Sequence, residues 1–275
     1  MRSQALRLTT VKPAWRVSIK PVGRSPARTS GTERFIPKFY HDPPGVGFPP
    51  DLAHALLVKR LNRFAVLVER AGVQLAAHLA NSGRLQELLV PGRDVWLAPR
   101  AGPHRRTAWD LVLVAHEGIL VAVDSRLANS VIAAALTAGA VTHFSGFSRW
   151  RREVRLGTSR IDFAALEGPR TCFVEAKCVT LVEGGRALFP DAPTLRGTRH
   201  LRELTAFSTT ASAAGVLFVV QRPDARTFAP NQRADPLFCA ALKAAREAGV
   251  VAAAYRCSVT VAGIALDEPL PTELE

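Results

Sequence analysis

The sequence of 275 residues lacks the features that mark several classes of protein. No apolar run approaches the roughly 20 residues of a membrane-spanning helix, because His116, Glu117 and Gly118 break the longest stretch. The four cysteines form no C-x-x-C pair, which argues against a zinc ribbon or a dithiol redox motif. Tyrosine and tryptophan are scarce, with two and four residues, so we expect Trp96, Trp109 and Trp150 in the core or at a domain interface rather than on a stacking surface. We therefore expect neither a membrane protein nor a cysteine-based metal protein.

The positions of the cysteines indicate a structural role. Cys172 and Cys178 share the apolar face of one predicted strand, and Cys239 and Cys257 lie in other apolar segments. Such residues are typical of small core side chains in a reducing compartment. The start of the chain also has no continuous apolar segment like that of a secretory signal. The expected location is cytoplasmic.

The chain carries a large excess of positive charge, +13 at pH 7. Residues 1–50 hold nine basic and two acidic residues, and the remaining residues hold 27 basic and 21 acidic ones. This excess favours a polyanionic partner, and DNA is the partner we expect, contacted through its phosphate backbone. The alternative is a basic surface that only keeps the protein soluble. A second basic cluster, within residues 149–160, consists of Arg149, Arg151, Arg152, Arg155 and Arg160.

The pattern of turn residues and apolar segments predicts three regions. Residues 1–50 contain eight prolines among many basic residues, which predicts a disordered Pro/Arg-rich extension. Residues 51–124 show five or six short strand-like segments and one short helix, Arg84 to Leu89. This pattern is typical of a small β-barrel, and an OB-like fold is the natural candidate.

Residues 125–275 alternate helical and strand-like segments, which predicts a mixed α/β domain. An Ala-rich helix is expected from Arg126 to Ala138, and a second helix carries Leu201, Leu204 and Phe207 on one face. Asp235 and Pro236 are typical of the start of a third helix, which Gly249 ends. Between the strands and the second helix, residues 180–197 are predicted to form a long loop.

One predicted strand of the α/β domain carries charge on a face of its own. Side chains alternate along a strand, so Glu175 and Lys177 point away from the apolar face that holds Val174 and Ala176. The preceding strand contains Asp162, and the turn residues between the two strands allow a hairpin in which both acids converge. The arrangement predicts a divalent-metal phosphodiesterase site.

Asp162 and Glu175 are the expected metal ligands, with Mg²⁺ as the cation and Mn²⁺ as its substitute. Lys177 would orient or deprotonate the attacking water, or neutralise charge that develops on the phosphate. Glu153 lies one strand earlier, and His200 could carry a proton or contact a phosphate. The alternative is a set of ion pairs on an exposed sheet face, worth about 0 to 1 kcal/mol.

From about Leu56 to Leu270 the sequence resembles the sugar fermentation stimulation protein (SfsA) family. The resemblance rests on separated blocks: Arg63-Phe64, His78 to Asn81, Gly83-Arg84, Glu87-Leu88, Ala128-Asn129, Ser159 to Phe163, Val174 to Leu181, Phe189 to Ala192, Arg196-Gly197 and His200 to Leu204. The blocks add Arg84 and Arg196 to the arginines that we expect to bind nucleic acid. The chain departs from the usual pattern at Ala176, Cys178, Pro193 and Leu195, and the last of these removes an acid near the site.

The resemblance implies an N-terminal OB-like barrel followed by a domain similar to the PD-(D/E)XK nucleases. It implies DNA binding without strong sequence preference and a link to the regulation of sugar metabolism. By position, Asp162 corresponds to the motif Asp, Glu175 and Lys177 to the E-x-K pair, and Glu153 to the upstream acid. The sequence thus predicts a DNA-binding protein with a magnesium-dependent nuclease site. The alternative is a non-catalytic regulatory module that keeps the nuclease fold, and no carbohydrate-specific site supports a sugar-metabolising enzyme.

Overall fold

The structure is a computed structural model that describes residues 43–208 and 212–273. Most of the predicted extension, up to residue 42, lies outside the described residues. Its last part differs from the expected disorder, because Gly45–Gly47 form strand β1, which pairs antiparallel with β16 (Gly263–Leu270). A Cβ on Gly45 would come within 2.7 Å of the carbonyl oxygen of Ile264, so this close pairing requires glycine. The division of the chain at residues 50 and 124 otherwise stays a prediction.

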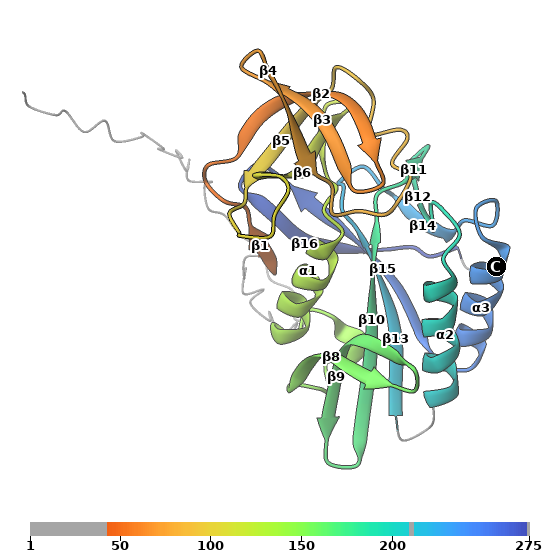
Figure 1. The fold of residues 1–275 in the computed structure, drawn as a ribbon. Helices are drawn as coiled ribbons and strands as arrows, with labels where there is room; N and C mark the ends of the chain where they lie inside the picture. Colours follow the sequence, from red (N-terminus) through yellow and green to blue (C-terminus); the bar gives the residue numbers. More distant parts are fainter. Residues whose placement is uncertain (1–42, 209–211, 274–275) are drawn as a thin grey trace, which may run out of the picture. The chain divides into compact units, whose positions relative to one another are not determined.

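The N-terminal region is the predicted OB-like barrel (Figure 1). Its strands are β2 (Ala53–Asn62), β3 (Ala65–Arg70), β4 (Val73–His78), β5 (Asp94–Pro99), β6 (Trp109–His116) and β7 (Ile119–Ala122). The strands follow the order β4-β3-β2-β5-β6-β7, and pairing of His78 with Asp110 joins β4 to β6 and closes the barrel. Alternate side chains of these strands, such as Val66 and Val68, fill a fully buried interior.

The short helix expected from Arg84 to Leu89 does not form. Leu85 adopts a left-handed conformation with φ of 50°, and only isolated turns follow it. Leu85 and Leu88 are both buried in the barrel interior. Burial of these two side chains outweighs the weak helical preference of a six-residue segment.

The C-terminal region is the predicted mixed α/β domain, built on a seven-stranded sheet with the order β1-β16-β15-β13-β10-β9-β8. The strands not yet given are β8 (Trp150–Leu156), β9 (Ser159–Glu167), β10 (Arg170–Val179), β13 (Ser212–Val220) and β15 (Val251–Val259). Strands β10, β13 and β15 are parallel, and the remaining pairs are antiparallel. The predicted hairpin of β9 and β10 is present.

Three helices cover the two faces of this sheet (Figure 1). Helix α1 (Arg126–Thr137) packs on the face that holds Val174 and Ala176. Helices α2 (Leu195–Phe207) and α3 (Pro236–Glu247) pack together on the opposite face. The Asp235 carboxylate accepts a hydrogen bond from the Phe238 amide, which confirms the predicted start of α3. A short 3₁₀ helix, Thr142–Phe144, follows α1.

The long loop predicted at residues 180–197 is wrong. It contains β11 (Val182–Glu183) and β12 (Arg186–Phe189), which form a three-stranded sheet with β14 (Thr227–Pro230), and it also contains the start of α2. Pairing of β12 with the distant β14 fixes this segment, and such a contact leaves no local signal. No helix in the described ranges is long and apolar enough to cross a membrane.

Candidate functional site

Three acidic residues lie level with one another across β8, β9 and β10. Register places Arg152 opposite Phe163 and Val154 opposite Ile161, so Glu153 is level with Asp162. Pairing of β9 with β10 ends where Phe163 meets Val174, which places Glu175 level with Asp162. The regular pairing of strands is interrupted at this level, and the interruption frees backbone groups for side-chain contacts.

The carboxylate of Asp162 occupies this interruption. Its Oδ2 accepts a hydrogen bond of 2.9 Å from the Ala176 amide, and its Oδ1 accepts one of 2.7 Å from Asn129 Nδ2 on α1. The side chain is therefore drawn into the gap between the strands, a position that strict alternation of faces does not predict. Burial, and then the negative charge of Glu175, raise the pKa of Asp162 above its ordinary value.

Glu175 is buried, but two cationic or hydrogen-bonding partners compensate its charge. Its Oε1 lies 2.6 Å from Lys177 Nζ and 2.6 Å from His200 Nδ1. Burial by itself raises the pKa of Glu175, but the Lys177 ammonium and the His200 contact outweigh it and hold the pKa at about 2. Glu175 is thus an ionised carboxylate with a fixed orientation.

His200 is fully buried, and both of its ring nitrogens have partners. Arg196 Nε donates to His200 Nε2 over 3.3 Å, which leaves Nδ1 as the ring nitrogen that donates to Glu175. Both nitrogens of the buried ring are therefore engaged by neighbouring side chains. His200 thus orients the Glu175 carboxylate, and its expected role as a proton carrier or phosphate contact stays a prediction.

Glu153 differs from the two buried acids. Its backbone is in the left-handed region, with φ of 57°, and its exposed carboxylate pairs with Arg160 Nε at 2.6 Å. Backbone strain of this kind in a non-glycine residue is common beside functional sites. Glu153 lines the same cleft as Asp162 and Glu175, but as an outer residue.

The acids lie in a cleft of about 580 Å³ that the barrel and the α/β domain line together. The barrel contributes Arg63 and residues 81–83, and α1 contributes Arg126 and Asn129. Asp191, which follows β12, also lines the cleft, and its Oδ2 accepts a hydrogen bond of 2.7 Å from the Arg84 amide. Sequence reasoning did not name residues 81–83 as site residues, nor Arg63, Arg126, Asn129 and Asp191. The polar Asn129 in an otherwise Ala-rich helix is the one local signal that could have indicated a role.

The arginines expected to bind nucleic acid separate into two groups. Arg152 and Arg196 line the cleft, and the Arg152 guanidinium lies 5.8 Å from the centre of the Phe163 ring. The other five are exposed but do not line it: Arg84, Arg149, Arg151, Arg155 and Arg160. Arg160 is occupied by its ion pair with Glu153.

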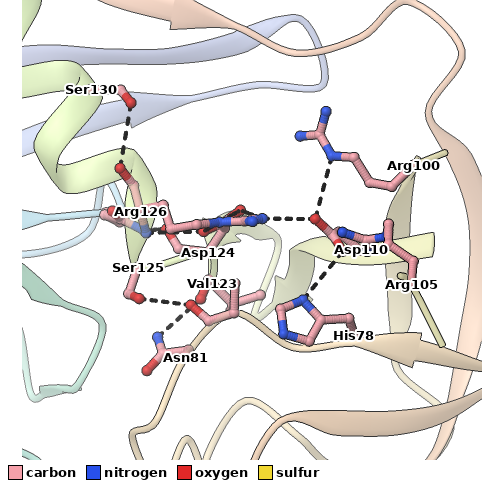
Figure 2. A network of polar contacts seen from close by, with 12 residues as sticks. His78, Asn81, Arg100, Arg105, Asp110, Val123, Asp124, Ser125, Arg126 and Ser130 are labelled. Carbon is pink, nitrogen blue, oxygen red and sulfur yellow. Dashed lines mark hydrogen bonds and ion pairs between the residues drawn. The ribbon is translucent and has the colours of Figure 1, made fainter. Parts of the chain in front are cut away.

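A second polar cluster lies where the barrel meets α1 (Figure 2). We call it the junction cluster, and its members are His78, Arg100, Arg105, Asp110, Asp124 and Arg126. The Asp110 carboxylate is completely buried and contacts His78 Nδ1, Arg100 Nε, Arg105 Nη2 and Arg126 Nη2. Arg126 also donates to Asp124 from Nε and Nη2. We call the other group, Asn129, Asp162, Glu175, Lys177 and His200, the cleft cluster.

Asp162 and Glu175 are the residues of the cleft cluster that could hold a hard divalent cation. Mg²⁺ typically takes one or two carboxylates from a protein and keeps water or phosphate oxygens as its other ligands. Asp162 and Glu175 offer such a pair, close enough for the Asp162 amide to lie 3.4 Å from Glu175 Oε2. Across the part of the chain that the structure describes, no group of three or more His, Cys, Asp or Glu side chains is arranged to hold a metal. Water and substrate would have to complete the coordination.

The four cysteines are free, as the sequence indicates. Burial raises the pKa of Cys172 and of Cys257 to about 12, which keeps both thiols protonated and unreactive. Cys178 lines the cleft, but burial raises its pKa as well. None of them is a nucleophile at neutral pH.

Two family models match the chain in the order of its regions. Residues 58–123 match the SfsA N-terminal OB domain, and residues 126–263 match the sugar fermentation stimulation protein RE domain. A sugar fermentation stimulation protein homolog from Moorella thermoacetica is 47% identical over 232 residues, which cover 83% of this chain and 100% of that protein. The homolog from Chloroflexus aurantiacus is 44% identical over 220 residues, with 80% and 85% covered.

A solved structure supports the same assignment. The structure titled "The structure of Pyrococcus Furiosus SfsA in complex with Ca2+" superposes with a TM-score of 0.76 at 30% sequence identity. The match covers 82% of this chain and 97% of that one. Sequence and fold therefore agree, and the chain belongs to the sugar fermentation stimulation protein family.

Proposed function

We propose that the protein binds DNA and that its α/β domain carries a magnesium-dependent phosphodiesterase site. One observation carries the proposal: two buried carboxylates, Asp162 and Glu175, lie level on adjacent strands in a cleft lined by arginines, with the Lys177 ammonium 2.6 Å from Glu175. A carboxylate pair with an adjacent lysine suits phosphodiester hydrolysis. The carboxylates can hold a cation that activates the attacking water, and the lysine can neutralise charge that develops on the phosphate.

Asp162 and Glu175 would hold the cation, with Mn²⁺ as a substitute for Mg²⁺. The name of the Pyrococcus furiosus structure records Ca²⁺ with that relative, which supports a preference for hard, oxygen-binding cations. A bound cation of this kind polarises a phosphoryl oxygen and lowers the pKa of a coordinated water. The remaining work falls to side chains of this chain.

Each side chain of the cleft cluster has a separable task. Asn129 fixes one oxygen of Asp162, and the Ala176 amide fixes the other. His200 holds Glu175 ionised and oriented. Lys177, which is mostly buried and lines the cleft, neutralises the negative charge of an approaching phosphate.

Nucleic-acid binding rests on the barrel and on the charge of the cleft. OB folds bind oligonucleotides on one face of the barrel, and Arg63 of this barrel lines the cleft together with Arg152 and Arg196. Contacts to phosphates carry little sequence information, so binding should be weakly selective and strongly salt-dependent. The relatives are named for the stimulation of sugar fermentation, and a link between DNA binding and sugar metabolism in the cytoplasm is part of the proposal.

The test is a cleavage assay on plasmid, linear and single-stranded DNA and on RNA, with Mg²⁺ or Mn²⁺. Wild type should cleave at least one of these substrates, whereas Asp162→Ala and Lys177→Ala should each lose more than about 100-fold in rate. Asp94→Ala removes an exposed barrel carboxylate and is the matched control, expected to keep full activity. Activity that survives both cleft substitutions would show that this site is not the catalytic one.

A non-catalytic DNA-binding module is the second candidate. Glu175 Oε1 already has two partners, Lys177 and His200, an arrangement that also suits a purely structural ion pair. This candidate predicts DNA binding that is unchanged by Asp162→Ala and no cleavage under any metal condition. Fluorescence anisotropy with labelled DNA, run beside the cleavage assay, separates the two candidates.

A further inference from the structure

The turn between β2 and β3 presents an aromatic side chain to solvent beside the cleft. Phe64 is 48% exposed, and within residues 43–208 and 212–273 no other Phe, Tyr or Trp is as exposed. Arg63, its neighbour in the turn, lines the cleft that holds Asp162 and Glu175. Phe64 is thus a large exposed apolar side chain next to a residue that lines the cleft, and such exposure commonly marks a contact with a ligand.

The turn that carries Phe64 is held on both sides. The Phe64 amide donates to Asn62 Oδ1 over 2.8 Å, and the Leu79 amide donates to the Phe64 carbonyl over 2.9 Å. Arg60 Nη2 donates to the Arg63 carbonyl over 2.9 Å. Because the backbone is fixed in this way, the ring can be contacted without a large loss of conformational entropy.

Charge accompanies the exposed ring. The Arg63 guanidinium lies 5.5 Å from the centre of the Phe64 ring, so a cation and an aromatic face are presented together. A nucleotide has the complementary pair of groups, an anionic phosphate and a flat base. Base stacking on an aromatic ring next to a basic groove is the usual way in which proteins bind a single strand.

A second exposed apolar side chain, without an aromatic ring, also lies next to a cleft-lining arginine in the sequence. Leu195, in the first turn of α2, is 82% exposed, and its neighbours Thr194 and Arg196 both line the cleft. Apolar side chains and cleft-lining arginines are therefore adjacent in the sequence on the barrel side and on the α2 side. A paired duplex keeps its base faces stacked inside, so only an unpaired strand offers bases to such side chains.

The size of the cleft also favours a single strand over a duplex. Asp162 and Glu175 are only 9% and 3% exposed, so a scissile phosphate must enter the cleft to reach them. The volume of about 580 Å³ is that of a pocket for a small organic molecule, which falls on the order of 300 to 1,000 Å³. Such a space suits one strand rather than two.

We propose that the cleft takes an unpaired strand of nucleic acid, with one base stacked on Phe64 and adjacent phosphates at Arg63 and Arg196. The inference rests on the proposed function and narrows its substrate to single strands, overhangs and frayed ends. DNA and RNA share this chemistry, and the two are separate arms of the test.

The test measures the anisotropy of three labelled probes with the full-length protein in a metal chelator. The probes are an oligodeoxythymidylate, the oligouridylate of equal length and a blunt-ended, GC-rich duplex of two strands. Phe64→Ala should weaken binding of the preferred single strand about 5- to 100-fold and leave duplex binding within about twofold of wild type. Phe64→Trp should restore single-strand affinity, because a larger ring stacks at least as well.

Val73→Ala is the matched control, since Val73 is an apolar barrel residue that is 62% exposed and does not line the cleft. It should bind all three probes as wild type does. Phe64→Trp also gives a direct reading of stacking, because the added indole fluorescence should be quenched by the single strand and unaffected by the duplex.

Two results would overturn the inference alone: single-strand affinity that Phe64→Ala leaves unchanged, or an equal loss on the single strand and the duplex. Both leave the proposed function standing, since wild type still binds nucleic acid. Failure of wild type to bind any of the three probes would instead overturn the proposed function and the inference together. Thermal unfolding of each variant, expected to match wild type at these exposed positions, shows that the fold is intact.

Discussion

The two polar clusters both bury carboxylates, but they differ in how fully the charge is compensated. In the junction cluster, the single carboxylate of Asp110 contacts three arginines and one histidine. In the cleft cluster, Lys177 contacts Glu175 alone, and Asp162 has only neutral hydrogen-bond donors. The first cluster has cationic partners in excess, and the second has acids in excess.

The pKa values of the two aspartates move in opposite directions for this reason. Burial raises the pKa of Asp110, but Arg126 and Arg105 outweigh burial and lower it below its ordinary value. Burial and the nearby Glu175 raise the pKa of Asp162. A well-paired buried acid stabilises the fold, whereas the ionised form of a buried acid beside a second acid is destabilised, and an added cation would relieve this repulsion.

The clusters meet at one residue. Arg126 pairs with Asp110 and Asp124, and it also lines the cleft. Because Arg126 begins α1 and Asn129 follows one turn later, the junction cluster fixes the first turn of the helix that orients Asp162. The ion pairs of Arg126 with Asp110 and Asp124 therefore hold the helix turn from which Asn129 contacts Asp162.

Asp110→Asn should give the largest change in stability. The substitution keeps the shape of the side chain but leaves the arginines without their shared anion. Because Arg105 and Arg126 are 28% and 53% exposed, solvent relieves part of the cost, and the free energy of unfolding should fall by about 2 to 4 kcal/mol. Denaturant unfolding measures it. Asp94→Asn, which changes an exposed carboxylate, should lower the free energy of unfolding by less than about 0.5 kcal/mol. Equal losses of unfolding free energy in the two variants would show that Asp110 does not stabilise the fold more than a surface carboxylate does.

Metal ions should stabilise the fold through the cleft cluster alone. Mg²⁺ or Mn²⁺ at 100 times its Kd should raise the free energy of unfolding of wild type by about 2.7 kcal/mol, because binding favours the folded state. Asp162→Asn and Glu175→Gln should abolish this shift, whereas Asp110→Asn should keep it from a lower baseline. Thermal unfolding with and without chelator gives the readout. A shift that persists in Asp162→Asn would place the cation elsewhere.

In chelator, Asp162→Asn should stabilise the protein at neutral pH by about 0.5 to 1.5 kcal/mol, the usual scale of a single-site effect. The folded pKa of Asp162 is raised, so wild type loses stability as pH rises from 3.8 through that folded value. The variant should lack this loss.

The folded pKa of Asp110 is lowered, so the stability that its carboxylate contributes is present above pH 3.8 and disappears as pH falls. Denaturant unfolding across pH tests both signs, and a destabilised Asp162→Asn contradicts the first.

Local signals were sufficient for much of the fold. The Ala-rich periodic segment predicted α1, and the Asp235-Pro236 start predicted α3, because both signals lie within a few residues of the structure that they determine. The small sheet of β11, β12 and β14 escaped prediction because its strands are two to four residues long and β14 follows β12 only after a helix and a long strand. Strand pairing over such a separation is decided by tertiary packing.

The same division applies to the candidate site. Alternation along β10 and one hairpin were enough to predict that Asp162, Glu175 and Lys177 lie close together. Their catalytic role stays a prediction. Asn129 reaches Asp162 from a helix 33 residues earlier, and Arg63 reaches the cleft from another region of the chain. Such residues are found only when the packing of helix and barrel against the sheet is known.

Single arginines should separate binding from stability with the smallest effects. Arg152→Ala removes a cation that lines the cleft, so DNA affinity should fall about two- to fivefold and the slope of log affinity against log salt should decrease by about one. Arg151→Ala, one residue away and outside the cleft lining, is the matched control and should change affinity less. Arg126→Ala should instead lower the free energy of unfolding, since Asp110 and Asp124 lose a shared partner. If Arg152→Ala destabilised the fold as much as Arg126→Ala, the two clusters would not differ in the way that their charges indicate.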